Sequence, residues 1–317
     1  MLSLLQKVLS RSARRSAGHA SVALGEDSFA LVLVRREGGG KPSIEHCRVH
    51  STNGTLGDRL STVLDKLGAS RAATCAVVDA DDYQVVQVEA PDVLPSEMRA
   101  AVRWRLRDSI SFKVDDAAVD VFDIPESARR TPTRMLFAVA ARAAAVERLT
   151  STVQPAAKGF YAIDIPELCL RNISALLPQD DKGVAVLALN ENYAQLVTTR
   201  QGVMYLTRRI DTARRFEPHA QSRVEADLDA GALALELQRS LDYYESHYDQ
   251  TPIGELVIAP GGERAERVAA ALRNETSLRI SVLDVREFCN VYKSGELVTD
   301  WPSLMALGAA LRTESAE

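Results

Sequence analysis

A short apolar run that ends in two glycines and a helix is the stretch of this sequence best suited to hold a ligand. It reads Leu256-Val257-Ile258-Ala259, then Pro260-Gly261-Gly262, then a helix that begins with Glu263-Arg264-Ala265-Glu266. Glycine lets backbone N–H groups approach a ligand closely, and the N-terminus of a helix favours an anion. The pattern indicates a turn that could cradle a nucleotide, although two glycines before a helix also serve as an ordinary turn.

The other sequence motifs that carry chemistry are missing. There is no GxSxG, HExxH or P-loop pattern. His46, Cys47 and His50 cluster, but the alternation of a strand sends His46 and Cys47 to opposite faces, so we expect no metal site there. The cysteines lie far apart and form no CxxC pair, which predicts reduced thiols in a reducing compartment.

Length and composition predict a globular protein with two medium-sized lobes or one large fold. The chain has 317 residues, of which 46% are hydrophobic and 26% are charged. Its net charge of −5 argues against general binding to nucleic acid. No apolar run approaches the length of a membrane span.

The first sixteen residues differ from the rest of the chain, because they contain basic residues and no acid. On a helix their apolar side chains share one face, which predicts a basic amphipathic segment, residues 1–18, on an anionic membrane surface. The residues expected at that surface are Leu5, Lys7, Arg11, Arg14 and Arg15. A frayed, solvated tail is the alternative, and one short helix would bind only weakly and reversibly.

The order of predicted elements repeats once along the chain. Each half begins with a β-hairpin, a third strand and a helix, and continues with a strand and a second helix. Ala23-Leu24-Gly25-Glu26-Asp27 in the first half matches Ala188-Leu189-Asn190-Glu191-Asn192 in the second. Two β-β-β-α-β-α units predict duplicated α/β lobes with a cleft between them, unless two short hairpins are similar by chance.

Three stretches resemble pilus-assembly proteins of the PilM type, which are similar to actin-like ATPases. The first is the long helix Glu236–Tyr248 (ELQRSLDYYESHY) followed by IAPGG. The second, Leu94–Ile110, resembles the inserted PilM subdomain, and the third, Pro302–Arg312, looks like its closing helix. The resemblance covers most of residues 21–312 and is nearest to the MshI-type branch that serves mannose-sensitive hemagglutinin (MSHA) pili.

The resemblance implies an actin-like ATPase (ribonuclease H-like) α/β fold with two duplicated lobes. The first lobe is expected over residues 19–178, with a PilM-type subdomain inserted at about residues 83–140, and the second over 179–317. It also implies a cytoplasmic component of a type IV pilus-like machine, peripherally associated with the inner membrane. Such a protein would dock the cytoplasmic N-terminal tail of a PilN-like single-pass inner-membrane partner.

For that tail we predict a binding site in the cleft beside the inserted subdomain. The residues chosen are Glu97, Trp104 and Arg105, from the helix that begins after Pro95. Arg103, Arg105 and Arg107 spread around the outer side of that helix, so an ordinary solvated face is the alternative.

The nucleotide site that the resemblance implies has lost its charged residues. ATP hydrolysis in this fold needs an aspartate in the first hairpin of each lobe, to hold the Mg²⁺ water shell and orient the attacking water. The repeat places Ala23 and Ala188 at those positions, and Ala30 where PilM-type proteins carry a lysine. The nearby acids would repel a nucleotide; they are Glu26, Asp27 and Glu191. We therefore expect no ATPase activity, no metal and no cofactor.

Weak binding of ATP through the adenosine side is what could persist. The residues that would contribute are Gly25, Glu236, Arg239, Gly261 and Gly262. Glu236 and Arg239 could instead be a surface pair, worth a few tenths of a kcal/mol. Two other hypotheses stay open: a PilM-type switch that changes conformation on binding ATP, and the actin-like cytoplasmic domain of a type II secretion platform protein.

Overall fold

The computed structural model describes residues 18–36, 40–51, 54–125, 134–211, 230–248, 250–291 and 298–313. The N-terminal residues predicted to face a membrane lie outside these ranges: Leu5, Lys7, Arg11, Arg14 and Arg15. Within the described ranges, no helix is long and apolar enough to cross a membrane.

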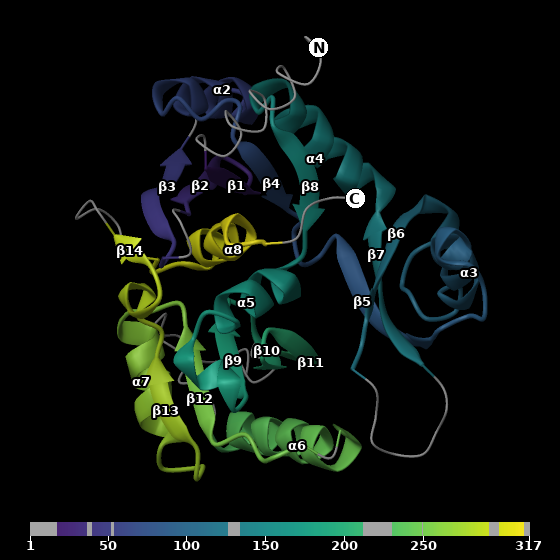
Figure 1. Ribbon diagram of the computed structural model, residues 1–317, viewed down its shortest axis with the longest axis vertical. Helices are drawn as coiled ribbons and strands as arrows, with labels where there is room; N and C mark the ends of the chain where they lie inside the picture. The colour runs from purple at the N-terminus through teal and green to yellow at the C-terminus, as the bar shows by residue number, and fades with distance from the viewer. Residues whose placement is uncertain are drawn as a thin grey trace, which may run out of the picture.

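The first lobe is built on a six-stranded sheet in the order β14-β3-β2-β1-β4-β8 (Figure 1). Its strands from this half of the chain are β1 (His19–Leu24), β2 (Ser28–Arg35), β3 (Ser43–Ser51), β4 (Ala73–Val77) and β8 (Phe160–Asp164). β1 pairs with β2 in antiparallel fashion and with β4 in parallel. Helices α2 (Leu56–Lys66) and α4 (Ala143–Ala156) pack against each other beside this sheet.

The second lobe repeats this topology in a five-stranded sheet, in the order β11-β10-β9-β12-β13. Its elements are β9 (Val184–Leu189), β10 (Tyr193–Arg200), β11 (Val203–Asp211), α6 (Ala230–Tyr248), β12 (Glu255–Ala259), α7 (Glu263–Leu272) and β13 (Arg279–Val282). β9 is antiparallel to β10 and parallel to β12, as β1 is to β2 and β4. The predicted duplication of α/β lobes is therefore confirmed.

The last helix of each half packs against the sheet of the other half. α5 (Pro166–Ser174) contacts β9 and β10, whereas α8 (Trp301–Ala310) contacts β1 and β2. The two helices also touch each other between the sheets (Figure 1). β14 (Asn290–Val291) pairs with β3, so β14 and α8, both from the predicted second lobe, complete the first sheet and its packing.

The sequence of α8 explains its place at the centre of the molecule. The Asp300 carboxylate accepts a hydrogen bond of 2.8 Å from the Ser303 N–H and caps the helix. The helix is apolar all round, and its residues 303–310 are buried, because one side faces the first sheet and another faces α5. Ser21 Oγ of β1 donates to the Ala306 carbonyl, and Asn172 Nδ2 of α5 donates to the Gly308 carbonyl at 3.0 Å.

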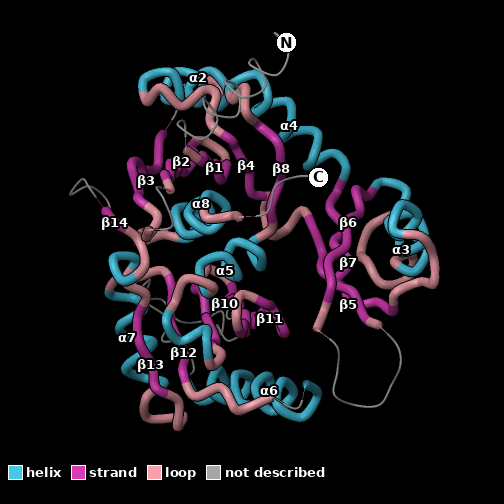
Figure 2. The backbone as a smooth tube through the Cα atoms, viewed as in Figure 1, coloured by secondary structure: helices cyan, strands magenta, loops and turns pink. Residues whose placement is uncertain are grey.

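The chain between β4 and α4 forms a separate subdomain, shown to the side of the two lobes in Figure 2. Its three-stranded antiparallel sheet has the order β5-β7-β6, with β5 (Tyr83–Glu89), β6 (Ala117–Asp123) and β7 (Met135–Arg142). α3 (Met98–Arg105) covers this sheet and follows a 3-10 turn at Pro95–Glu97. The subdomain has its own core, which includes Met98, Val102, Leu106, Val114 and Leu136.

The tyrosines of α6 belong mainly to the core of the second lobe. Tyr244 and Tyr248 are buried and pack edge-on against Tyr205 of β11, whereas Tyr243 is exposed and stacks on His247. The structure describes all four cysteines; none of them forms a disulfide, and three are buried.

Candidate functional site

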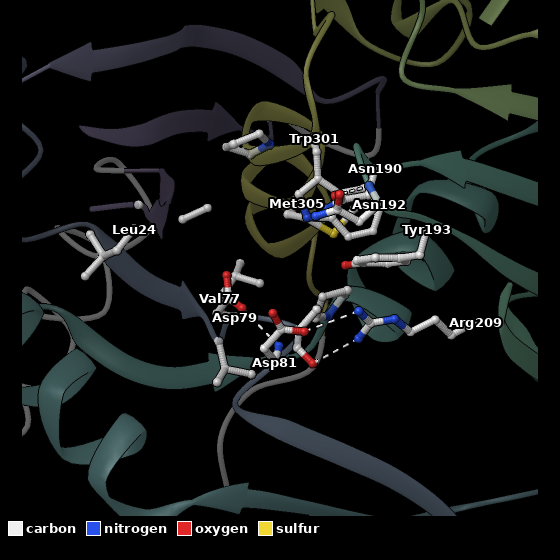
Figure 3. A pocket seen from close by; sticks show the side chains of 16 residues that line it. Leu24, Val77, Asp79, Asp81, Asn190, Asn192, Tyr193, Arg209, Trp301 and Met305 are labelled. Atoms are coloured by element: carbon white, nitrogen blue, oxygen red, sulfur yellow. Dashed lines mark hydrogen bonds and ion pairs between the residues drawn. The ribbon is translucent and has the colours of Figure 1, made fainter. Parts of the chain in front are cut away.

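A cavity of about 260 Å³ lies between the two lobes, where a cleft was predicted. The carboxyl ends of β1 and β4 meet the β9–β10 turn, the end of β11 and the start of α8 there (Figure 3). Its polar lining residues are Asp79, Asp81, Asn190, Asn192, Tyr193, Arg209 and Trp301. Open α/β sheets bind ligands outside the carboxyl ends of their strands, so this cavity is the candidate ligand site.

The two alanines at the positions where aspartates were expected lie at equivalent places in the two lobes. Ala23 is the last residue but one of β1 and pairs with Val77, and Ala188 holds the same place in β9 and pairs with Ala259. Ala23 lines the cavity, whereas Ala188 is completely buried. Ala30 lies opposite Ala23 in the hairpin and is also completely buried. Their methyl groups can neither hold Mg²⁺ nor pair with a phosphate.

A guanidinium group bridges the two lobes across one side of the cavity. Arg209 of β11 lies over the Tyr193 ring, with its Cζ atom 3.8 Å from the ring centroid. Its Nη2 atom is 3.2 Å from Asp81 Oδ1, and its Nη1 donates to the Ala80 carbonyl at 3.4 Å (Figure 3). Trp301 packs edge-on against the other side of Tyr193, at 5.4 Å between ring centroids. Because Asp81 is highly exposed, the ion pair itself contributes at most about 1 kcal/mol.

A second cavity, of about 370 Å³, lies beside the inserted subdomain and shares Ala80, Asp81 and Arg209 with the first. Its remaining lining residues are Tyr83, Gln84, Val85, Ser111, Phe112, Arg142, Glu167, Gln195 and Thr207. They come from the subdomain, from α5 and from the sheet of the second lobe. This cavity is the cleft beside the subdomain that the sequence predicted.

A buried hydrogen bond forms one wall of the second cavity. Tyr83 Oη donates to Glu167 Oε2 at 2.5 Å, and both side chains are buried. Burial raises the pKa of the Glu167 carboxyl and raises the pKa of the Tyr83 hydroxyl well above its usual value. The pair joins the first strand of the subdomain to α5 at the junction of the lobes.

The predicted partner-binding residues Glu97, Trp104 and Arg105 line neither cavity. Trp104 is 68% exposed, and the Arg107 guanidinium lies over its ring at 4.7 Å. Arg105 Nη1 lies 3.5 Å from Glu89 Oε2. The helix α3 uses Met98 and Val102 to pack on its sheet, which turns these three residues outward, so the structure places them outside the cleft that was predicted to contain them.

Of the five residues predicted for a vestigial nucleotide site, only Gly25 lines the first cavity. Glu236 and Arg239 form a 2.9 Å ion pair on the surface of α6, which matches the alternative interpretation. A Cβ atom on Gly261 would lie 2.9 Å from the Leu283 carbonyl, and Gly262 caps α7 with a φ of +123° that disfavours other residues. Backbone geometry therefore accounts for both glycines without a ligand.

The polar residues of the first cavity were not predicted from the sequence; of its lining residues, the sequence singled out only Ala23 and Gly25 as part of a site. One signal could have found part of the site: Asp79, Asp81 and Asp82 follow a buried strand directly, and the carboxyl end of such a strand is where ligands bind. Tyr193 and Arg209 carry no such signal, because the contact between them depends on the pairing of β10 with β11.

The described residues contain no group of three or more side chains that could hold a metal ion. His46 and His50 do come together, with their Nε2 atoms 2.9 Å apart and their rings stacked. The alternation of the strand separated His46 from Cys47, but the contact between the His46 and His50 rings was not predicted.

Solved structures with a similar fold span nearly the whole chain. The PilM–PilN type IV pilus biogenesis complex matches with a TM-score of 0.66 and 20% identity, covering 92% of this chain and 97% of that one. The protein has an actin-like, PilM-type fold. The predicted fold class and the predicted likeness to PilM are thus confirmed.

A secretion protein has a related fold. The cytoplasmic domain of EpsL, an inner-membrane component of the type II secretion system of Vibrio cholerae, matches with a TM-score of 0.50 and 10% identity, covering 93% of this chain and 96% of that one. No protein-family model and no curated protein matches the sequence. At these identities the likeness establishes the fold, and the roles of individual residues must come from the chain itself.

Proposed function

We propose that this protein is a cytoplasmic adaptor of a type IV pilus-like machine that docks the cytoplasmic tail of a PilN-like, single-pass inner-membrane protein. The observation that carries the proposal is the likeness to the PilM–PilN complex over 92% of the chain, inserted subdomain included. The loss of both expected carboxylates, at Ala23 and Ala188, supports a binding role in place of an ATPase.

We propose that this system is the MSHA pilus. The absence of both expected carboxylates is the feature by which the chain resembles the MshI-type branch. The likeness to the EpsL cytoplasmic domain supports a second candidate, a component of a type II secretion platform. Pull-down of the chain against the tails of the pilus partner and of the secretion partner separates the two systems. Binding to the secretion tail alone would replace the first proposal with the second.

The tail is expected to contact the exposed outer face of α3. Trp104 is the most exposed large apolar side chain of the described residues, and tryptophan is enriched among the residues that dominate binding at protein interfaces. Trp104→Ala is expected to weaken binding of the tail by about 30-fold, the loss that corresponds to a hot spot of ~2 kcal/mol. Fluorescence anisotropy of a labelled tail peptide measures this.

Leu235→Ala is the matched control for that experiment, because Leu235 is also a large exposed apolar residue, on α6 of the other lobe. It should leave the affinity for the tail unchanged. A tail that binds wild type and Trp104→Ala equally would remove Trp104 from the site. A tail that does not bind the wild-type protein would overturn the adaptor function.

Mg-ATP is expected not to bind, or to bind too weakly to act as a substrate. Ala23 and Ala188 stand where carboxylates were expected to hold Mg²⁺, and Arg209 bridges the lobes at the cavity that Ala23 lines. Isothermal titration should show no binding at Mg-ATP concentrations up to about 1 mM. The same titration is made with Arg209→Ala, which removes the bridge between the lobes. If this variant also fails to bind Mg-ATP, the failure is assigned to the missing carboxylates. Micromolar binding to wild type would favour the ATP-dependent switch.

We also propose that residues 1–18 attach the protein peripherally to the inner membrane, on the strength of their basic amphipathic sequence. Vesicles with anionic lipid should float the full chain and leave a chain without residues 1–16 at the bottom of the gradient. Neutral vesicles and high salt should both reduce flotation. Equal flotation of the two chains would rule out this attachment.

A further inference from the structure

A buried hydroxyl group at the first cavity has no partner in the part of the chain that the structure describes. Tyr193 is 6% exposed, and its Oη atom is buried without a hydrogen bond. Figure 3 shows this hydroxyl pointing into the cavity that Tyr193 lines. A buried polar atom without a partner costs about 1–3 kcal/mol, so native proteins rarely retain one that no ligand or water satisfies.

The charges around the cavity favour a cation over an anion. The acids at the cavity and on the two hairpin turns that border it are Glu26, Asp27, Asp79, Asp81 and Glu191. The cations there are already engaged: Arg209 pairs with Asp81, and Arg264 donates to the Asn190 carbonyl at 2.9 Å. An anionic nucleotide would meet unbalanced negative charge at this cavity.

Asp79 is the acid best placed to receive a ligand. It lines the cavity, and one of its oxygens, Oδ1, accepts a hydrogen bond of 2.9 Å from the Asp81 N–H. No ion pair to Asp79 exists among the described residues. Its carboxylate and the Tyr193 hydroxyl are two of the acceptors that line the cavity.

The cleft already accommodates one guanidinium group. Arg209 lies between the Tyr193 ring and Asp81, the combination of an aromatic face and a carboxylate that suits a planar cation. A cavity of about 260 Å³ is smaller than most pockets for drug-sized ligands, which begin near 300 Å³. Its size fits one side chain or a small amine.

We propose that this cavity binds an alkylammonium or guanidinium group, through the Asp79 carboxylate and the Tyr193 hydroxyl. One source is a lysine or arginine of the partner's tail, and this source rests on the proposed adaptor function. Cytoplasmic segments next to a membrane span are rich in these residues, which complements the acidic cleft. The other source is a free polyamine, which needs no partner.

Titration calorimetry on the full chain tests the proposal, with agmatine as the probe because it carries both an amine and a guanidinium. Tyr193→Phe and Asp79→Asn are each expected to weaken agmatine binding about 10-fold, the loss for one hydrogen bond to a charged group. Asp65→Asn is the matched control, since Asp65 is an exposed acid at the end of α2, which leads into the start of β4, whereas the cavity lies at the end of that strand; this variant should bind as wild type does.

Thermal unfolding separates a ligand-binding hydroxyl from a structural one. Because the Tyr193 hydroxyl has no partner without ligand, Tyr193→Phe should keep or raise the Tm of the free protein while it weakens agmatine binding. A lower Tm with unchanged agmatine binding would overturn the proposal. So would equal binding to wild type and Asp79→Asn, absence of agmatine binding, or displacement of agmatine by Mg-ATP at lower concentration.

The tail peptide and a version with its lysines and arginines replaced by glutamine identify the source of the cation. If Asp79→Asn weakens binding of the natural tail peptide but not of the glutamine version, the cation comes from the tail. If agmatine binds and the tail peptide does not, the natural ligand of the cavity is a free amine. That second outcome overturns the adaptor function and leaves the cation site in place, so the two proposals can fail independently.

Discussion

Gly308→Ala is expected to destabilise the protein by about 3 kcal/mol, although glycine-to-alanine changes in helices usually stabilise. Gly308 lies in α8, where α8 crosses α5 between the two lobes. A Cβ atom there would lie 2.6 Å from the Cys169 carbonyl carbon and 2.7 Å from its Cα, and closer still to the carbonyl oxygen. These are backbone atoms, so the two helices would have to move apart.

Urea unfolding of wild type and variant measures the loss. Gly254→Ala is the matched control, because a Cβ on Gly254 meets nothing within 4 Å and its backbone is open to any residue. We expect that control to unfold within about 0.5 kcal/mol of wild type. If Gly308→Ala proves as stable as wild type, the crossing of α5 and α8 tolerates a wider separation than the structure shows.

Arg312→Ala is expected to cost about 3–5 kcal/mol, because it leaves a buried carboxylate without its counter-ion. Arg312 Nη1 lies 3.1 Å from Asp164 Oδ2, and the Asp164 side chain is 1% exposed. Asp164 ends β8 of the first sheet, and Arg312 follows α8, so the pair holds the end of α8 in place. Denaturant unfolding at neutral pH measures the loss.

The effect of Arg312→Ala should depend on pH. Burial raises the pKa of the Asp164 carboxyl above the ordinary value of 3.8, and Arg312 opposes that rise. A raised carboxyl pKa favours folding at acid pH and costs stability as pH rises through the folded-state pKa. Without Arg312 the pKa rises further, so the variant should fall further below wild type at pH 7 than at pH 4.

An exposed ion pair of similar length serves as the control for that experiment. Arg279 Nη1 lies 2.9 Å from Glu255 Oε1, but the Arg279 side chain is 81% exposed. Arg279→Ala should cost less than about 1 kcal/mol at either pH. If Arg279→Ala and Arg312→Ala lose the same free energy of unfolding, the burial of Asp164 does not increase the contribution of its ion pair to stability.

Both variants test the same feature, the exchange of terminal helices between the halves of the chain. Because α5 packs on the second sheet and α8 on the first, each lobe needs the other half of the chain to bury its sheet. Destabilising α8 should therefore destabilise the packing between the lobes. The same helix lines the first cavity with Trp301 and Met305.

Local patterns were enough to predict the strands and the duplicated lobes. Continuous apolar runs such as β9 (VAVLAL) are strands in the structure, because a strand that is buried on both faces of its sheet carries apolar side chains on both. The match of two hairpins also placed Ala23 and Ala188 at equivalent ends of β1 and β9. Both inferences use residues that are neighbours in the sequence.

The binding residues were harder to predict, because their positions depend on which face of an element packs inward. Trp104 was assigned to the cleft, yet Met98 and Val102 take the inner face of α3 and leave Trp104 outside. Glu236 and Arg239 were considered for a nucleotide, and they pair with each other on the surface of α6. Both stretches were correctly predicted as helices, but helical spacing alone does not show what a helix packs against.

The sequence by itself determined the fold class, the duplication and the absence of a carboxylate at the equivalent positions 23 and 188, since each depends on residue identity at fixed spacing. Only the tertiary structure decided that Arg209 meets Asp81 from the opposite lobe, that α8 covers the first sheet, and that the Tyr193 hydroxyl faces the cavity alone. These contacts join residues more than a hundred positions apart in two cases, and the third depends on a cavity that both lobes form. They exist only once the lobes are packed together.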